Sequence, residues 1–249
     1  MSGHSRWAKL KHHKGAIDAK RGKLFSKHVR AIAAAARHGG GDPDYNPRLR
    51  AAVLAAEQDN VPRDNLERAI QRGTGKLEGV EFAEVTYEGY APGGVAVLVD
   101  VLTDNRNRTL PELRTLFERF GGNLGQDGCV SWMFERRGVA QVPKEKAAEE
   151  RLLEIALEAG AEDMRDGGDT WDVYALTESF EDVVAALRRA GVEPARAEVQ
   201  RVPKSQVHVE GSEAGKVLRL VEALEDHDDV QKVWANFDVP DEVLESLGG

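Results

Sequence analysis

The hydrophobic pattern of this 249-residue chain changes its period after Gly75. Before that point, apolar residues recur every three or four positions, which is typical of amphipathic helices. After it, short runs rich in Val and Tyr alternate with helical patterns, which indicates strands mixed with helices. The sequence therefore predicts a multidomain α+β protein whose N-terminal part is helical.

Residues 1–76 are predicted to form a three-helix bundle, because short amphipathic helices bury their apolar faces against one another. Asn46 and Pro47 have the residue types of a helix N-cap and a first helical position. A third helix opens at Pro62 and ends at Gly73. The apolar face of the first long helix comprises Phe25, Val29, Ile32 and Ala36.

Residues 77–135 are predicted to contain a hairpin, a helix and a further strand. The runs VTYEGY and VAVLVDV flank an Ala-Pro-Gly-Gly turn. In the helix that follows, Thr109 and Glu112 have the spacing of a capping box. The run CVSWMFE is typical of a strand. Residues 205–249 continue the same mixed pattern, so we expect 77–135 and 205–249 to form one discontinuous α+β domain.

Residues 136–204 have the element order β-α-β-β-α-β, which is the ferredoxin-like or split βαβ arrangement. The two ends of such a unit lie close together, as an inserted domain requires. We therefore expect three domains: a helical nucleic-acid-binding domain, a discontinuous α+β domain, and a ferredoxin-like α+β domain inserted into it.

Charge is distributed very unevenly along the chain, whose net charge is −9. Residues 1–38 hold ten Lys or Arg and one acid, a net charge of +9. Residues 39–76 are balanced, so residues 77–249 carry −18. This asymmetry indicates that the basic end meets a polyanion. The alternatives are a solvated basic face, or neutralisation by acidic groups elsewhere in the chain.

The basic segment suits nucleic acid, because Lys and Arg bind phosphates through charge and counterion release. Trp7 and the histidines add flat rings that stack on unpaired bases. The acidic remainder of the chain repels a phosphate surface, which confines contact to one end of the molecule. The predicted nucleic-acid-binding residues are Arg6, Trp7, Lys9, Lys11, His12, Lys14, Lys20, Arg21, Lys23, Lys27 and Arg30.

Other interpretations of the basic segment fit less well. A mitochondrial presequence is also basic and acid-poor, but this segment is rich in Lys and His and poor in Ser. A secretory signal or a membrane span requires an apolar run that the sequence lacks. His4, His12 and His13 do not supply the four ligands of a zinc site, so no metal or cofactor is expected. The single Cys129 suits a reducing cytoplasm.

A second candidate anion site lies in the loop TDNRNRT, where Asn105, Arg106, Asn107 and Arg108 stand beside a helix N-terminus. The alternative is a polar turn in which Asp104 and the arginines satisfy each other. The sequence leaves both interpretations open.

No catalytic motif stands out. The run RGTGK resembles a phosphate-binding loop, but Ile70 and Leu77 occupy positions that the Walker motif reserves for Gly and Ser or Thr. Cys129 lies in a strand-like run without a nearby base, which favours a buried structural thiol. We therefore predict a protein that is not an enzyme.

Several segments of the sequence carry a family resemblance, namely GHSRWAKLKHHKGAIDAKRGKLFSK, GGGDPDYNPRLR, DNVPRDNLERAIQRGTGK, YEGYAPGGVAVLVDVLTDNRNRT and FGGNLGQDGCVSWMF. They closely resemble the YebC family, which includes bacterial probable transcriptional regulators and the mitochondrial translational activator of cytochrome oxidase subunit one. The resemblance covers nearly the whole chain and implies three domains. It also implies either DNA-binding transcriptional regulation or a ribosome-associated role at proline-rich stretches. Cys129 stands where serine is usual in the family, and His13 where Arg is common.

The sequence therefore predicts a cytoplasmic, monomeric, non-enzymatic regulator that binds DNA, or ribosomal RNA near a transfer RNA. Two other classes stay open. One is a protein-interaction adaptor that works through the acidic α+β domains. The other is an enzyme that binds a small anion near Arg106.

Overall fold

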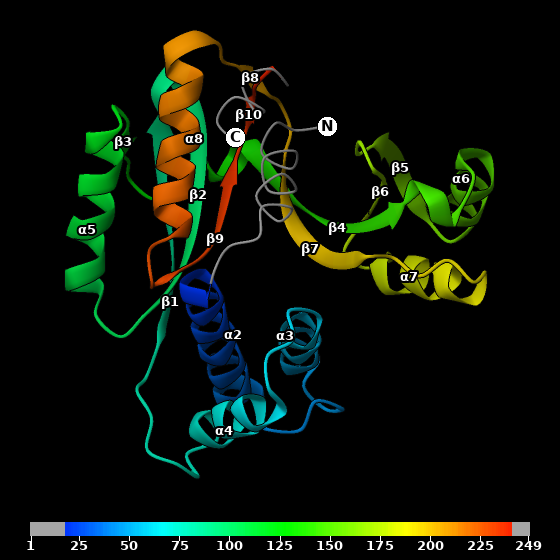
Figure 1. Cartoon of the computed structure of the whole chain (residues 1–249), viewed down its shortest axis with the longest axis horizontal. Helices are drawn as coiled ribbons and strands as arrows, with labels where there is room; N and C mark the ends of the chain where they lie inside the picture. Colours follow the sequence, from blue (N-terminus) through cyan, green and yellow to red (C-terminus); the bar gives the residue numbers. More distant parts are fainter. Residues whose placement is uncertain (1–17, 241–249) are drawn as a thin grey trace. The chain divides into compact units, whose positions relative to one another are not determined.

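A computed structural model of the protein describes residues 18–240, which alternate helices with short strands (Figure 1). The fold is α+β, as the sequence predicts. The described residues group into two compact units. The bundle–sheet unit contains residues 18–129 and 212–233, and the ferredoxin-like unit contains residues 130–211 and 234–240. The helical bundle and the hairpin after it thus share one unit, and the three-domain boundaries stay a prediction.

Three helices form the bundle: α2 (Asp18–Gly39), α3 (Pro47–Gln58) and α4 (Arg63–Gly73). The predicted start of α3 is confirmed, because the Asn46 side chain accepts a hydrogen bond from the backbone N–H of Leu49. The apolar faces of the three helices meet in one core. It contains Ile32, Ala35, Ala36, Leu49, Ala56, Val61, Leu66 and Ala69.

Small residues allow α2 and α4 to approach closely. A Cβ atom placed on Gly73 lies 2.3 Å from the Ala33 carbonyl oxygen and 2.8 Å from Ala36 Cβ. The end of α4 therefore packs directly on the alanine run of α2, and any side chain at residue 73 forces the helices apart.

The sheet of the bundle–sheet unit is built on the predicted hairpin. Strands β1 (Ala83–Ala91) and β2 (Val95–Thr103) pair antiparallel, from Ala91 opposite Val95 to Ala83 opposite Thr103. With β3 (Asn123–Leu124) and β9 (Val230–Ala235) they give the order β3-β1-β2-β9. Helices α5 (Arg106–Arg119) and α8 (Gly211–Glu225) run along this sheet (Figure 1). Strand β2 is buried at almost every position because it is central.

Two local predictions within residues 77–135 are wrong. Helix α5 begins before the predicted capping box, because Asn105 is the N-cap and its side chain accepts from the Arg108 N–H at 3.1 Å. Thr109 is instead fully buried and uses its hydroxyl in a polar network. In CVSWMFE, residues Ser131–Met133 form a 3-10 turn, and a strand begins only at Phe134.

The ferredoxin-like unit confirms the predicted β-α-β-β-α-β order. Its four strands form an antiparallel sheet in the order β5-β6-β4-β7. Alternate residues of the central strands, such as Val142 and Val173, pack against the two helices in one core. The elements are β4 (Phe134–Pro143), α6 (Glu149–Glu158), β5 (Ala161–Asp166), β6 (Thr170–Ala175), α7 (Phe180–Arg189) and β7 (Arg196–Pro203).

Two short strands complete the ferredoxin-like unit. Strand β8 (Val207–His208) pairs in parallel with β10 (Phe237–Asp238).

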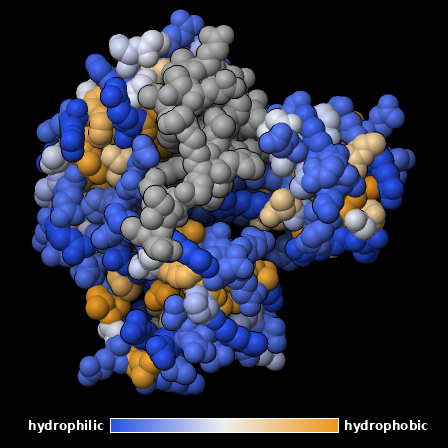
Figure 2. Space-filling model, viewed as in Figure 1, coloured by the Kyte–Doolittle hydropathy of each residue, from blue (hydrophilic) through white to orange (hydrophobic). Residues whose placement is uncertain are grey.

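On the face drawn in Figure 2, hydrophobic residues lie in small groups among hydrophilic ones. No helix within residues 18–240 is long and apolar enough to cross a membrane.

Two glycine substitutions in the bundle test the close approach of α2 and α4. Gly73→Ala is expected to lower the free energy of unfolding by about 1–3 kcal/mol, because the new methyl group overlaps the backbone of α2. Gly22→Ala is the matched control, since an added Cβ at this exposed position of α2 meets nothing within 4 Å. It is expected to raise the free energy of unfolding by up to about 1 kcal/mol. Urea denaturation followed by helical circular dichroism measures both changes, and equal effects contradict the packing argument.

Candidate nucleic-acid interface

Helix α2 carries the predicted basic residues whose side chains the structure describes, namely Arg21, Lys23, Lys27 and Arg30. The side chain of Lys20 lies outside the described part of the chain. The other predicted residues precede residue 18 and also lie outside it. They are Arg6, Trp7, Lys9, Lys11, His12 and Lys14.

Lys23, Lys27 and Arg30 share one face of α2, since they are four and three residues apart. This face meets the C-terminal end of α8. The Lys23 ammonium donates to the Asp226 carbonyl at 3.1 Å, and the Lys27 ammonium donates to the Glu225 carbonyl. The last carbonyls of a helix are unpaired and carry partial negative charge, so cations stabilise them.

The structure therefore brings these three basic residues together but directs them at backbone carbonyls and carboxylates of the same chain. For them, the contacts match the internal neutralisation that the sequence analysis gave as an alternative. Arg21 differs, because it is exposed and its guanidinium lies 5.4 Å from the centre of the Phe25 ring. Stacking on Phe25 leaves the N–H edges of that guanidinium available to an anion.

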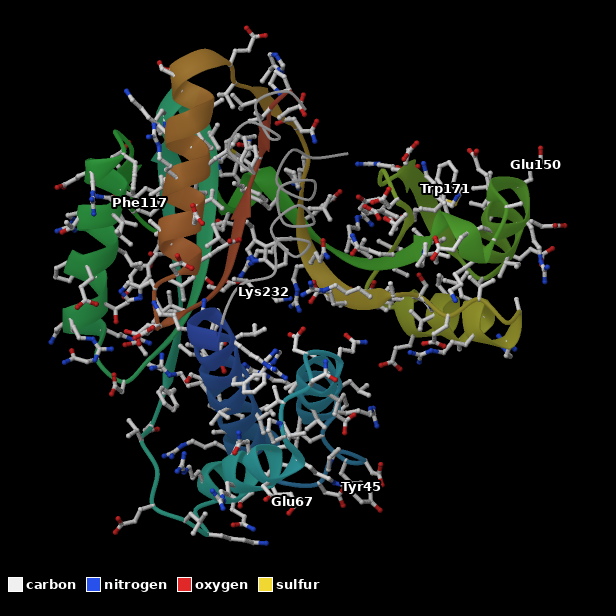
Figure 3. All side chains as sticks on the ribbon, viewed as in Figure 1. Tyr45, Glu67, Phe117, Glu150, Trp171 and Lys232 are labelled. Atoms are coloured by element: carbon white, nitrogen blue, oxygen red, sulfur yellow. The ribbon has the colours of Figure 1, made fainter. Side chains whose placement is uncertain are left out.

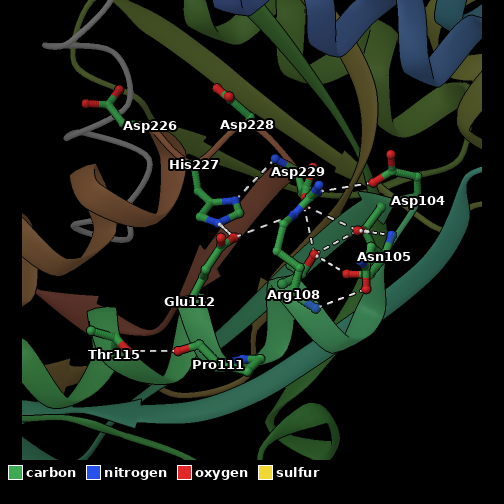
Figure 4. A network of polar contacts seen from close by, with 12 residues as sticks. Asp104, Asn105, Arg108, Pro111, Glu112, Thr115, Asp226, His227, Asp228 and Asp229 are labelled. Atoms are coloured by element: carbon green, nitrogen blue, oxygen red, sulfur yellow. Dashed lines mark hydrogen bonds and ion pairs between the residues drawn. The ribbon is translucent and has the colours of Figure 1, made fainter.

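Arg30 contacts Asp229, whose side chain is only 2% exposed. Figure 4 shows the network of polar contacts around Asp229. Asp229 lies just before β9, where its carbonyl accepts from the Leu102 N–H of β2 at 2.9 Å. One carboxylate oxygen accepts from Arg30 at 3.0 Å. The other accepts from Arg108, and from the hydroxyls of Thr103 at 3.2 Å and Thr109 at 2.8 Å. Groups from α2, β2 and α5 thus converge on one buried carboxylate.

The electrostatic balance at Asp229 favours the ionised form. Burial acts to raise the pKa of this carboxyl group. Hydrogen bonds from Arg108 and Thr109, with the positive charges of Arg108 and Arg30, outweigh burial and hold the pKa below its ordinary value of 3.8. The carboxylate therefore stays charged at neutral pH and binds α2 to the sheet.

The candidate anion site at residues 105–108 is largely occupied by the chain itself. The Arg108 guanidinium contacts Asp229 and lies 3.2 Å from Asp104, and the Asn105 side chain caps α5 (Figure 4). This arrangement matches the polar turn that the sequence analysis gave as the alternative. Arg106 and Asn107 are exposed, so anion binding there stays a prediction that rests mainly on Arg106.

Glu112, His227 and Asp229 offer ligand-type atoms within 4.8 Å of one another, a spacing that a metal ion could bridge. His227 Nε2 is 3.0 Å from a Glu112 carboxylate oxygen. The Arg108 guanidinium contacts Asp229 and approaches Glu112 to 3.9 Å. Because a cation already lies between the two carboxylates, a metal ion there would meet a neighbouring positive charge. The cluster is a structural ion network.

Cys129 is half-buried rather than buried as predicted, but it has the environment of a structural thiol. Burial and the nearby charge of Glu88 raise the pKa of the thiol above its usual range, so it is protonated at neutral pH. The Tyr90 hydroxyl donates to the Cys129 carbonyl at 3.0 Å, which holds this turn against the sheet. An added Cβ on Gly125 would lie 2.5 Å from the thiol sulfur, so the thiol is closely packed.

Sequence reasoning missed Asp229 as the partner of both arginines. It is one of several acids in the run EDHDD, which joins α8 to β9. All of these acids have the same local context, so spacing alone does not select one. The one local indication of its role was that Asp229 directly precedes an apolar strand, a position that favours burial of its side chain.

A helical bundle followed by two α+β parts, one of them ferredoxin-like, defines a multidomain α+β protein with a basic N-terminus. Residues 5–76 match the N-terminal domain of the TACO1/YebC protein, and residues 82–237 match the TACO1/YebC second and third domains. The chain belongs to the TACO1/YebC family.

Curated relatives and a solved structure agree with this assignment. A protein of Desulforapulum autotrophicum is 52% identical over 99% of this chain and 100% of its own length, and one of Dictyoglomus turgidum is 55% identical over the same shares. Both are named probable transcriptional regulatory proteins. The crystal structure of a conserved hypothetical protein from Aquifex aeolicus is 50% identical and superposes with a TM-score of 0.82. That match covers 90% of this chain and 93% of the other.

Removing the charge of Asp229 is expected to destabilise the protein. Asp229→Asn leaves Arg30 and Arg108 without their carboxylate and should lower the free energy of unfolding by about 2–3 kcal/mol. The matched control is Asp228→Asn, because the Asp228 side chain is 68% exposed and its ion pair with Lys23 is long, at 3.8 Å. We expect the control to stay within about 0.5 kcal/mol of the parent protein. Chemical denaturation measures both, and similar losses would mean that Asp229 has no special role.

The same carboxylate predicts a specific pH dependence. Because its pKa is lower in the folded protein, Asp229 stabilises the fold at pH values above 3.8. This stabilisation is lost as the pH falls through the lower folded-state pKa. The stability difference between the parent protein and Asp229→Asn should therefore be constant near neutral pH and shrink below about pH 4. Urea titrations from about pH 7 to pH 3 test this, and a constant difference over the whole range contradicts it.

Proposed function

We propose that this protein is a monomeric, non-enzymatic regulator of gene expression that binds nucleic acid through its basic N-terminal segment. One observation carries the proposal: residues 1–38 have a net charge of +9, whereas residues 77–249 have −18. Relatives more than half identical to the chain are named probable transcriptional regulatory proteins, which supports a regulatory role.

The contacts of α2 narrow the set of residues expected to bind phosphates. Lys23, Lys27 and Arg30 already bind the end of α8 and Asp229. The proposal therefore rests mainly on cations that precede them, with Trp7 and His12 as flat partners for bases. These cations are Arg6, Lys9, Lys11, Lys14, Lys20 and Arg21.

Ribosomal RNA near a transfer RNA is the target that we favour over duplex DNA. A protein that wraps a duplex needs positive charge over a broad surface, whereas here the charge is confined to one end. A single basic segment suits a narrow RNA-lined crevice. Sedimentation with ribosomes, compared with gel shifts on promoter DNA, separates the two targets, and co-migration with neither contradicts both. The cytoplasmic location is part of the same proposal.

A protein-interaction role is the second candidate. Leu153 and Leu157 lie one turn apart on α6 and are 37% and 51% exposed, and Leu176 of the same unit is 43% exposed. An adaptor that uses this surface would keep its partner after the basic lysines are replaced. A nucleic-acid regulator of the proposed kind would lose its target.

Replacing Lys9, Lys11, Lys14 and Lys20 together with alanine is expected to weaken nucleic-acid binding. Each lost phosphate contact removes about 0.7–0.9 from the slope of log affinity against log salt, so the slope should flatten by about 3. Fluorescence anisotropy of a labelled RNA across a salt series measures both effects.

The double variant Lys23→Ala, Lys27→Ala, which removes two positive charges from the same basic region, provides a contrast. Because these lysines bind α8 within the chain, their loss should lower stability and leave the salt slope nearly unchanged. The assignment would be reversed if the double variant flattened the slope and the quadruple variant did not.

A further inference from the structure

Tyr45 is the most exposed large hydrophobic residue in the described part of the chain, with 86% of its surface accessible. The other three tyrosines, Tyr87, Tyr90 and Tyr174, are buried or half-buried. In Figure 3, Tyr45 lies at the outer edge of the helical bundle. A single exposed aromatic ring is not unusual by itself. Tyr45 differs because the loop that carries it is held in place on both sides.

The loop between α2 and α3 is clamped directly beside Tyr45. Asn46 is buried, and its side-chain amide donates to the carbonyls of Ala35 at 2.9 Å and Gly40 at 2.8 Å. Its oxygen caps α3. An added Cβ on Gly39 would lie 2.6 Å from the Asn46 amide, so this packing requires glycine. Asn46 therefore binds the loop to both helices at once.

The residues on the other side of Tyr45 are also held in place. The Asp42 carboxylate accepts from the Asp44 N–H at 3.0 Å, and the Asp42 carbonyl accepts from the Tyr45 N–H at 3.3 Å. Pro43 and Pro47 fix backbone angles near both ends of the segment. The backbone is thus ordered before any partner arrives, while the ring faces water. Such preorganisation reduces the entropy lost on binding.

The groups around Tyr45 favour a nucleobase as its partner. The Arg50 guanidinium is exposed and donates to the Pro43 carbonyl at 3.4 Å, so a cation lies beside the loop that carries Tyr45. The carboxylates of Asp42 and Asp44 repel a phosphate group at the ring. They do not repel a neutral base, whose amino groups donate hydrogen bonds to carboxylates. Stacking of a base on an exposed tyrosine is the common means of binding unpaired RNA.

We propose that Tyr45 is a stacking platform for an unpaired nucleobase of RNA, separate from the basic segment that binds phosphates. The inference rests on the proposed function and deepens it, because it selects single-stranded or looped RNA over a duplex. In a duplex the base faces are covered by neighbouring pairs, so Tyr45 adds affinity only for unpaired bases.

The test compares full-length variants on two labelled probes: a single-stranded RNA of about 12 nucleotides and a DNA duplex of about the same length. Tyr45→Ala should bind the single strand about 5- to 100-fold more weakly and the duplex equally well. Tyr45→Phe should stay within about twofold of the parent protein, because it keeps the ring. Tyr45→Leu should lose affinity, because it keeps only the apolar bulk. Leu54→Ala is the matched control, since Leu54 is a 51% exposed residue of the same bundle.

Each outcome has a distinct meaning. Parent-like binding of the single strand by Tyr45→Ala overturns the stacking role, and so does an equal loss on both probes. If the unsubstituted protein binds neither probe, the proposed function fails as well. If Tyr45→Ala reduces sedimentation with ribosomes but not RNA binding, Tyr45 contacts a protein, which also overturns the inference. Photocrosslinking of 4-thiouridine RNA to Tyr45, read by mass spectrometry, should place a base on the ring.

Discussion

The buried carboxylate of Asp229 is the interaction on which the bundle–sheet unit depends. Taking a carboxylate out of water is unfavourable by several kcal/mol unless it is well paired. Here Arg30 arrives from α2, Arg108 and Thr109 from α5, and Thr103 from β2. Since these partners come from three elements of the unit, the ionised carboxylate couples the helical bundle to the sheet.

This coupling changes the meaning of the basic N-terminal region. By composition, residues 1–38 form one cationic segment. Within its described part, however, several basic side chains contact other groups of the same chain. Lys23, Lys27 and Arg30 face the end of α8, where they neutralise carbonyl dipoles and acidic side chains. These contacts bind α2 to the end of α8, and we propose that Arg21 and the cations before it in the sequence bind an external polyanion.

The sequence predicted the parts of the fold whose signals are local. Asn46 and Pro47 are adjacent residues that together predict the start of a helix. The turn of the hairpin likewise lies directly between the two strands that it joins. The contacts of Asp229 have no such signal, because Arg30 and Arg108 are 199 and 121 residues away in the chain. The start of α5 was predicted wrongly because two residues have N-cap character. Asn105 caps the helix, although Thr109 has the capping-box spacing to Glu112. The basic residues of the candidate site were found by composition, but their directions required the fold.

Phosphate binding and base stacking would give the protein two contributions to affinity that respond differently to salt. Counterion release makes the contribution of the basic segment fall steeply as salt rises. A base stacked on Tyr45 gains mainly from contact between flat surfaces, which salt screens far less. Low salt therefore favours any polyanion, whereas higher salt favours ligands with unpaired bases. A clamped loop that presents one aromatic ring would supply this discrimination, because Asn46 already holds the loop to α2 and α3.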